Sequence, residues 1–527
     1  MLRQCAFAAS IFLGASITSS GQLAIDWNLS LGGSNTDMPS QVVSTPDGGS
    51  LIVGRSSSDD LDFDAGLGNA DGVVLKMSSS GEVEWLKHYG GSQDDSLEDV
   101  AALSDGSFIV AGKSQSDDGD LAINHGSYDF WILKLTAEGD ILWSLSFGGS
   151  NDDMAKAVTI TQDGGIAVIG KSQSGDGDVS VNYGWHDIWI LKLSADGVLE
   201  WEKTLGGSSY DDPSDVLELA DGGFMVLAGT ESSDFDVSTN YSGQSGDGED
   251  CWVVKLDESG QIVWEKSFGG SGEDSPDELI QSDDGNYLIC GRTSSQDFDI
   301  AEANGSNDGW ILKIDDQAQL IWSKAFGGSE TDWIRAIEKA PEGGYFFTGY
   351  SQSDDGMVPG NYGGHDCWIG HLTEEGQLLW SQNFGGSSDD RSSSLSIQED
   401  GKILVAGYST SADIDVVNNN GGYDYWLAGL ISDETQSVRA PDSPPLFTFH
   451  PNPTMDGQLQ VHGLDFSQGE FTSELVSLTG VRVNVDMNSV NSTNGECTLH
   501  LGDFTPGIYL LRIEQQGIWA TRKVIIH

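Results

Sequence analysis

The stretch YDFWILKLTAEGDILWSLSFGGSNDD, residues 128–153, recurs in close copies along most of the chain. It predicts two strands joined by a turn, followed by a Gly-Gly-Ser loop and an Asp. Gly-Gly-Ser begins at residues 32, 90, 148, 206, 269, 327 and 385, with a Trp five residues before each start and an Asp five residues after it. Seven regular copies indicate a repeat architecture.

Each copy contains four segments of strand composition, which we call a, b, c and d. In the third copy they are KAVTITQ, IAVIGKS, DIWILKL and VLEWEKTL, and Asp- and Gly-containing turns separate a from b and c from d. Such turns favour tight hairpins because Gly and Asp tolerate positive φ. Repeated four-stranded antiparallel units predict an all-β fold, a seven-bladed β-propeller with four-stranded blades.

The two ends of the repeat region predict how the ring closes. The region opens with a lone d segment, residues 25–31, and ends with a c segment, residues 425–431, that no d segment follows. If the N-terminal strand closes the last blade, seven whole blades form a ring without an incomplete sheet. The alternative is an open stack with an orphan strand at one end.

Propeller topology sorts the connections between two faces. The d-to-a loops, which carry Gly-Gly-Ser, and the long b-to-c loops emerge on one face, which we call the loop face. The a-to-b and c-to-d turns emerge on the other, and they are short. Most differences between copies fall on the loop face, where variable loops on a regular scaffold commonly bind ligands.

Composition limits the classes of function. The chain has 527 residues with 83 Asp and Glu against 24 Lys and Arg, a formal net charge of −59, and most of this charge lies in the repeats. Such a surface repels nucleic acid, so we expect no nucleic-acid partner. No stretch after the N-terminus approaches the roughly 18 apolar residues of a membrane helix, so we expect no transmembrane segment.

The chain divides into four predicted parts. Residues 1–21 have a basic residue, a short apolar run and then small residues, the build of a secretory signal peptide. Residues 22–431 form the propeller of roughly 58-residue repeats, and residues 432–445 are a Pro- and Asp-containing linker. Residues 446–527 lack the repeat and alternate apolar and polar residues, which predicts a small β-sandwich.

The tail resembles the type A C-terminal sorting domain of the type IX secretion system of Bacteroidetes. The matching motifs are Pro451-Asn452-Pro453 after an aromatic strand, Leu478-Thr479-Gly480, Pro506-Gly507-Ile508-Tyr509, and Lys523-Val524-Ile525-Ile526 near the terminus. The final His527 departs from many relatives, which stop on Lys or an apolar residue. The repeats resemble Gly/Asp-rich β-propeller repeats of bacterial surface proteins.

This resemblance implies a partner and a location. The tail would be recognised by the type IX secretion machinery, and the cargo would be secreted or held at the outer-membrane cell surface. In such proteins the sorting domain is commonly removed on export. The sorting-signal residues that carry over are Pro451, Asn452, Pro453, Gly480, Gly507, Tyr509 and Lys523.

The repeated Asp and Trp residues are interpreted as structural. The Asp of the Gly-Gly-Ser loop and the Asp of the Asp-x-Trp motif at the start of strand c recur in all seven copies, whereas catalysis needs one asymmetric site. A carboxylate that accepts backbone N–H bonds in a tight loop is needed in every blade. The Trp residues are expected in the core between blades, and the cysteines at 251, 290, 367 and 497 as buried thiols.

Paired acids in the b-to-c loops leave two interpretations open. Asp-x-Asp spacing lets two carboxylates reach one Ca²⁺, but no loop completes an EF-hand pattern. Solvated acidic loops are the simpler interpretation, and weak Ca²⁺ sites are the alternative. The residues concerned include Asp118, Asp120, Asp176, Asp178, Asp234, Asp236, Asp297 and Asp299. No other cofactor is expected.

Five residues just before strand c are candidate ligand contacts on the loop face: Tyr128, Trp185, His186, His365 and Tyr423. Plain loop residues are the alternative interpretation. No nucleophile motif marks a catalytic serine, and the only arginines of the repeats, at 55, 292, 335 and 391, lie in different blades. We therefore assign no catalytic residue.

These observations predict a secreted or cell-surface binding and adhesion propeller without enzymatic activity, whose ligand is a glycan or a protein. Two other hypotheses stay open. One is a polysaccharide-acting propeller enzyme, a lyase or glycosidase, with its site at the central channel. The other is a structural surface-layer component. An asymmetric His, Arg and acid cluster in a deep pocket would favour the enzyme, and seven similar loops would favour binding.

Overall fold

The structure is a computed structural model that describes residues 23–432 apart from 64–65, 122, 243–247, 301–302 and 399–400, together with the backbone of eight strands between residues 448 and 526. Two compact units separate within it. One is Leu23–Ile431, and the other contains Ser432–His527. The predicted signal peptide and linker, except for Ser432, lie outside the described residues.

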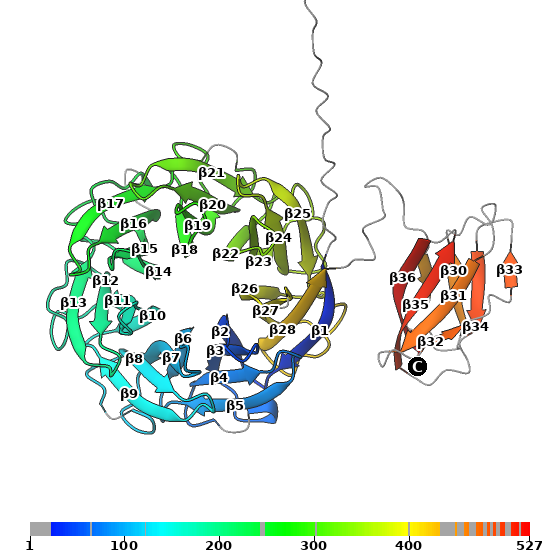
Figure 1. Cartoon of the computed structure of the whole chain (residues 1–527), viewed down its shortest axis with the longest axis horizontal. Helices are drawn as coiled ribbons and strands as arrows, with labels where there is room; N and C mark the ends of the chain where they lie inside the picture. Colours follow the sequence, from blue (N-terminus) through cyan, green and yellow to red (C-terminus); the bar gives the residue numbers. More distant parts are fainter. Residues whose placement is uncertain are drawn as a thin grey trace, which may run out of the picture. The chain divides into compact units, whose positions relative to one another are not determined.

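Leu23–Ile431 forms a ring of seven four-stranded antiparallel sheets, the blades (Figure 1). In blades 1 to 6 the strands follow one another in chain order from the channel outwards. Blades 1 to 4 contain β2 (Asp37–Ser44), β3 (Ser50–Ser56), β4 (Asp71–Met77) and β5 (Val83–Tyr89); β6 (Asp95–Ala102), β7 (Phe108–Ser114), β8 (Asp129–Leu135) and β9 (Ile141–Phe147); β10 (Asp153–Ile160), β11 (Ile166–Ser172), β12 (Asp187–Leu193) and β13 (Leu199–Leu205); and β14 (Asp211–Glu218), β15 (Phe224–Thr230), β16 (Asp250–Leu256) and β17 (Ile262–Phe268).

The remaining blades close the ring as the sequence predicts. Blade 7 has the strand order β1-β28-β27-β26, so the N-terminal strand completes the last sheet. A short 3-10 helix, Leu61–Phe63, follows β3. The strands of blades 5 to 7 are β18 (Asp274–Gln281), β19 (Tyr287–Thr293), β20 (Asp308–Ile314) and β21 (Leu320–Phe326); β22 (Asp332–Lys339), β23 (Tyr345–Ser351), β24 (Asp366–Leu372) and β25 (Leu378–Phe384); and β26 (Asp390–Ile397), β27 (Ile403–Ser409), β28 (Asp424–Ser432) and β1 (Leu23–Leu31).

Every inner strand carries a β-bulge at the same point. In blade 3 the pairing of β10 with β11 shifts between Ala155 and Ala157, and the six other blades repeat the shift at the equivalent place. The bulged residue, Lys156 in this blade, lines the central channel. A bulge leaves its extra residue out of the ladder and re-aims the side chain. Seven such positions therefore ring the channel.

The core lies between the blades. The six Trp residues of strand c are fully buried, and Trp189 of blade 3 packs edge-on against Phe130 of blade 2 with ring centroids 4.8 Å apart. The Trp residues of strand d hold the outer rim: Trp143 of blade 2 lies against the turn glycine Gly197 of blade 3. Both sets therefore pack between neighbouring blades, as expected. The three cysteines at 251, 290 and 367 are buried and free.

The C-terminal unit is described by its strands alone. They form two four-stranded antiparallel sheets, in the orders β29-β30-β34-β33 and β32-β31-β35-β36. The bounds are β29 (Thr448–His450), β30 (Gln458–His462), β31 (Phe471–Ser477), β32 (Arg482–Asn484), β33 (Ser489–Asn491), β34 (Glu496–His500), β35 (Gly507–Gln515) and β36 (Ile518–Ile526).

Removing residues 23–31 should destabilise the ring, because β28 would lose its outer partner and expose an unpaired edge. Trp27 of this strand also lies against Gly429 of blade 7 and Gly81 of blade 1. We expect the melting temperature to fall by about 5 °C or more. A synthetic peptide of residues 22–31 should restore it in differential scanning calorimetry, and a scrambled peptide should not. An unchanged melting temperature would contradict the role of the closing strand.

Candidate functional site

Carboxylates accept the backbone N–H groups of the Gly-Gly-Ser loops on the loop face, three in six of the copies and two in the sixth copy, where Met357 stands in place of the third Asp. In the third copy three consecutive backbone N–H groups donate to three different side chains. Gly148 donates to Asp178 at 3.2 Å, Gly149 to Asp153 at 2.7 Å and Ser150 to Asp176 at 2.8 Å. Consecutive N–H groups that converge in this way form an anion-binding concavity. Here the protein fills that concavity with its own side chains.

The loop Asp is a buried structural group. Asp153 is fully buried and also accepts hydrogen bonds from the hydroxyls of Ser172 and Ser174, the latter at 2.7 Å. Burial raises the pKa of Asp153, and these hydrogen bonds counter part of the rise. The equivalent Asp residues of the other copies accept the same set of bonds. The repeated Asp thus accepts backbone N–H bonds, as the sequence predicts.

The paired acids proposed for Ca²⁺ also bind the backbone of these loops. Each pair in blades 2 to 5 receives the N–H of a Ser and of the first Gly: Asp118 and Asp120, Asp176 and Asp178, Asp234 and Asp236, and Asp297 and Asp299. Within the described residues, no group of three His, Cys, Asp or Glu side chains is arranged to hold a metal ion. The Ca²⁺ hypothesis stays a prediction.

Around the channel the seven bulged residues differ from blade to blade. They are Ser40, Glu98, Lys156, Ser214, Asp277, Arg335 and Ser393, and with their neighbours they line a hollow of about 70 Å³. Arg335 pairs with Asp277 at 2.5 Å. Among the described residues that line the hollow, Arg335 and Lys156 are the two cations. The hollow is therefore small and asymmetric.

Two acids beside this hollow tie neighbouring blades together. Asp99 of blade 2 accepts the backbone N–H of Val158 in blade 3 at 2.7 Å, and Asp215 of blade 4 accepts that of Leu279 in blade 5 at 2.9 Å. Burial raises the pKa of Asp99 to about 7 and that of Asp215 to about 6. These acids hold blades together at the channel wall.

The sequence analysis missed this channel ring, although a signal was present. The ring position lies eight residues after the first Gly of each Gly-Gly-Ser and holds Ser, Glu, Lys, Ser, Asp, Arg and Ser in turn. Two residues further on, ten residues after that Gly, every copy has an aliphatic residue. Change between Ser, acidic and basic residues close to a constantly aliphatic position marks a side chain that the blade core does not constrain.

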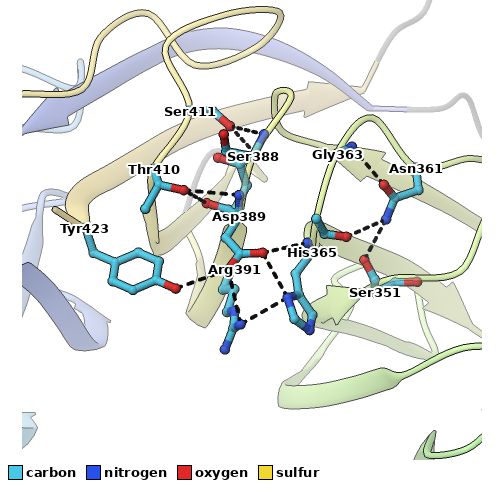
Figure 2. A network of polar contacts seen from close by, with 12 residues as sticks. Ser351, Asn361, Gly363, His365, Ser388, Asp389, Arg391, Thr410, Ser411 and Tyr423 are labelled. Atoms are coloured by element: carbon cyan, nitrogen blue, oxygen red, sulfur yellow. Dashed lines mark hydrogen bonds and ion pairs between the residues drawn. The ribbon is translucent and has the colours of Figure 1, made fainter. Parts of the chain in front are cut away.

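The mouth of the channel holds a polar network between blades 6 and 7 (Figure 2). Asp389 is its centre: it accepts the backbone N–H of His365 at 3.0 Å and the hydroxyl of Tyr423 at 3.2 Å. Nδ1 of His365 lies 3.0 Å from both Asp389 Oδ1 and Arg391 Nη2, so it donates to the first or accepts from the second according to its tautomer. Arg391 also covers the ring of Tyr350 at 5.0 Å.

The charges in this network are set by burial and by one another. Burial, followed by the charge on Arg391, lowers the pKa of His365 although Asp389 opposes this, so the imidazole is neutral at neutral pH. Burial alone would raise the pKa of Asp389, but the His365 hydrogen bonds and Arg391 outweigh it and the pKa is lowered. Burial also raises the pKa of Tyr423. The network therefore presents one cation and one anion, both already paired.

The predicted contacts separate into three places on the loop face. His365 and Tyr423 meet through Asp389, as described above. His186 lies 3.6 Å from Asp212 between blades 3 and 4, and Trp185 beside it is 66% exposed. Tyr128 lines a cavity of about 110 Å³ between blades 1 and 2, together with Arg55 and Lys113. The structure does not gather the five residues into a single site.

The arginines, by contrast, come together more than their separate blades suggest. Arg292 of blade 5 lies 3.9 Å from the ring centre of Trp333, and Arg335 of blade 6 lies 5.1 Å from the same ring. Tyr350, which lies under Arg391, packs on Trp333 as well, with ring centroids 5.7 Å apart. Residues of blades 5 to 7 thus form one cluster of arginines and aromatic rings at the mouth, which the sequence analysis did not predict.

The sorting-signal residues fall largely outside what the structure describes. Pro451, Asn452, Pro453 and Gly480 lie outside the described residues. Gly507 and Tyr509 are in β35 and pair with Ile526 and Val524 of β36, where Lys523 also lies. The backbone of two of the matching motifs therefore forms one antiparallel pair.

Comparison with known proteins identifies the tail. Residues 448–527 match the family described as the secretion system C-terminal sorting domain. The chain therefore carries a type IX secretion sorting domain, which implies recognition by the secretion machinery and secretion or attachment to the cell surface. Among the described residues, no helix is long and apolar enough to span a membrane.

Other comparisons give weaker similarities. The chain is 25% identical over 186 residues to the regulatory protein FlaEY of Caulobacter vibrioides, a match that covers 32% of this chain and 18% of that protein. Among solved structures, a Penicillium chrysogenum alpha-L-arabinanase is 10% identical with a TM-score of 0.36, covering 63% of this chain and 92% of that one. A puromycin hydrolase is 10% identical with a TM-score of 0.43, covering 86% and 58%.

Asp153→Ala should destabilise the propeller by about 2 to 4 kcal/mol, because it leaves one buried N–H and two hydroxyl groups without their acceptor. Urea unfolding followed by Trp fluorescence measures the change. Asp196→Ala, at an exposed turn on the opposite face, is the matched control and should change the free energy of unfolding by less than about 0.5 kcal/mol. Equal effects of the two substitutions would contradict a structural role for the loop Asp.

Glu249, at the mouth between blades 4 and 5, should make stability depend on pH. Its carboxyl fills the space next to Gly229, and burial, then the charges of Asp212 and Glu273, raise its pKa to about 8. The folded protein therefore keeps a proton that the unfolded chain loses above its ordinary pKa of about 4.5. The stabilising contribution is complete below pH 4.5 and is lost as the pH rises towards 8.

Glu249→Gln removes this titration, so its free energy of unfolding should fall less between pH 5 and 8 than that of the wild type, by up to about 1.4 kcal/mol per pH unit. Glu258→Gln, an exposed substitution on a turn, is the control and should follow the wild type. Parallel pH profiles for all three proteins in urea unfolding would contradict the raised pKa.

Proposed function

We propose that the propeller is an exported binding protein without enzymatic activity, which holds a glycan or protein ligand on its loop face. One observation supports this most strongly. The backbone and most of its carboxylate clamps repeat from blade to blade, and side chains that differ between blades gather around the channel mouth on the loop face. Regular scaffolds with variable loop residues are typical of binding surfaces.

The chemistry of the mouth also favours binding. The hollow between the blades is small, about 70 Å³, and three arginines that reach it or its rim are held by carboxylates: Arg335 by Asp277, Arg391 by Asp389 and Arg292 by Glu273. Paired charges beside aromatic rings bind and orient a ligand, whereas general acid–base catalysis needs a group that is free to give or take a proton.

A polysaccharide-acting enzyme, a lyase or glycosidase, is the second candidate, and one observation favours it. His365 is neutral and lies beside Asp389, Arg391 and Tyr423, an asymmetric cluster at the channel mouth. A neutral imidazole next to a guanidinium suits proton abstraction near a carboxylate-bearing carbon. The shallow hollow beside the cluster is the reason that we place this candidate second.

The delivery of the protein fits the same proposal. We propose that the tail is a type A sorting domain of a Bacteroidetes protein, that its two sheets form a β-sandwich, and that it is removed on export after the signal peptide. The propeller then works at the cell surface or in the medium. Ca²⁺ at the paired acids of the loop face is part of the proposal as a stabilising ion, because Asp-x-Asp spacing offers hard oxygen ligands.

A glycan array probed with the purified chain tests the binding function. We expect selective binding to a group of related glycans, strengthened by millimolar Ca²⁺ relative to a chelator. Turnover of the bound glycans, measured as released reducing ends or unsaturated products, should be absent. His365→Ala should not change the binding of glycans that contact loops far from His365. An empty array together with an empty pull-down would contradict binding, and turnover that disappears in His365→Ala would establish the enzyme instead.

A further inference from the structure

One position of the b-to-c loop has left-handed backbone in every blade. In three blades it is glycine, with φ of 66° at Gly119, 67° at Gly177 and 65° at Gly356. In the other four blades it is a large apolar residue with φ between 51° and 57°: Leu61, Phe235, Phe298 and Ile414. L-residues with bulky side chains rarely adopt this conformation, because Cβ crowds the backbone. Glycine at the same point of neighbouring blades shows that the fold does not need the side chain.

These four side chains face solvent, so core packing does not explain them. Leu61 is 61% exposed, Phe235 66%, Phe298 68% and Ile414 51%. Each residue combines an unfavourable backbone with an apolar side chain in water. At Phe235 and Phe298, which also contact an aromatic ring of the preceding blade, a cost without a structural return is typical of a residue kept for function.

In blades 3 to 5 the exposed residues belong to a group of aromatic pairs. Phe235 lies against Tyr183 of the preceding blade, with ring centroids 5.2 Å apart and 32° between the planes. Phe298 lies against Tyr241 in the same way, at 5.1 Å and 34°. Trp185 stacks on Tyr210 at 5.8 Å and 22°. We call these six residues the aromatic sector.

We propose that the aromatic sector binds neutral polysaccharide by stacking sugar rings on its exposed ring faces. This rests on the proposed function of the loop face and names the ligand class. The C–H groups of a sugar ring are slightly positive and are attracted to the negative face of an aromatic ring. None of the six side chains carries a charge at neutral pH, so the sector offers no partner to a charged sugar.

The surroundings of the sector support a sugar with free hydroxyl groups. Tyr183 lies near Asp236 and Tyr241 near Asp299; burial, followed by these charges, raises the pKa of both tyrosines. The phenols therefore stay protonated and can donate hydrogen bonds. The net charge of −59 repels polyanions, which excludes acidic polysaccharides as the main ligand. A protein partner is the alternative that the experiment separates.

The test uses the full chain and the double variant Phe235→Gly and Phe298→Gly. Glycine is the residue that three other blades carry here, so the fold should tolerate it. We expect the melting temperature to stay the same or rise by about 1 to 2 °C as the backbone strain is relieved. Affinity for insoluble cellulose, β-1,3-glucan or mannan, whichever the wild type binds in a depletion assay, should fall about tenfold or more.

The matched control is Leu61→Gly with Ile414→Gly, at the equivalent positions of blades 1 and 7. It relieves the same backbone strain outside the aromatic sector, so the melting temperature should respond alike and the affinity should not change. Trp185→Ala should weaken binding without a large change in melting temperature, because Trp185 is exposed.

Several results would overturn the proposal. One is unchanged polysaccharide affinity in the Phe235 and Phe298 variant, and another is a fall in its melting temperature by more than about 5 °C, which would make the rings structural. A wild type that captures a defined protein but none of the three polysaccharides would also overturn it. If the wild type binds other glycans on the array and the variant binds them equally well, the proposed binding function stands and only the proposal for the aromatic sector is contradicted. If the wild type binds no ligand of any kind, both proposals are contradicted.

Discussion

In six of the seven copies the Gly-Gly-Ser loop bends so that three consecutive backbone N–H groups converge on three carboxylates, and in the sixth copy two carboxylates serve because Met357 replaces the third. Without acceptors these donors would be costly to bury, and the bend would not form. In the third copy the acceptors come from the start of the next inner strand, Asp153, and from the b-to-c loop, Asp176 and Asp178. The contact therefore joins the d-to-a loop to the blade that follows it. Repeated seven times, it fixes the spacing of blades on the loop face.

This constraint explains both the acidity of the chain and its regularity. The paired carboxylates of the b-to-c loops are, in the described blades, partners of backbone N–H groups. Most residues that serve the clamp repeat from copy to copy, whereas other positions vary. The bulged residue of strand a, the residues before strand c and the left-handed position of the b-to-c loop are among the positions that vary. The candidate sites lie at these positions.

The variable residues at the mouth of the channel differ in chemistry from those of the aromatic sector. At blades 5 to 7, arginines, tyrosines and Trp333 form paired and stacked contacts that leave little unpartnered charge. At blades 3 to 5, aromatic rings stand exposed, and two of them have a strained backbone. A surface of this kind suits recognition of an extended ligand across several blades. Export by the type IX secretion system delivers such a surface to where extracellular polymers are found.

The sequence by itself determined the number of blades, the four strands of each, the closing strand and the division between propeller and sorting tail. These follow from local patterns: strand periodicity, Asp-Gly turns and motifs repeated at near-constant spacing. Only the tertiary structure decided which variable side chains meet. Arg292 and Trp333, or His365 and Asp389, belong to different blades, so their contact depends on the rotation between blades and on side-chain rotamers. The sequence also did not reveal the backbone strain at Phe235 and Phe298, because the type of a residue does not determine its backbone angle φ. Local sequence fixes strands and turns, whereas contacts between blades arise only when the ring closes.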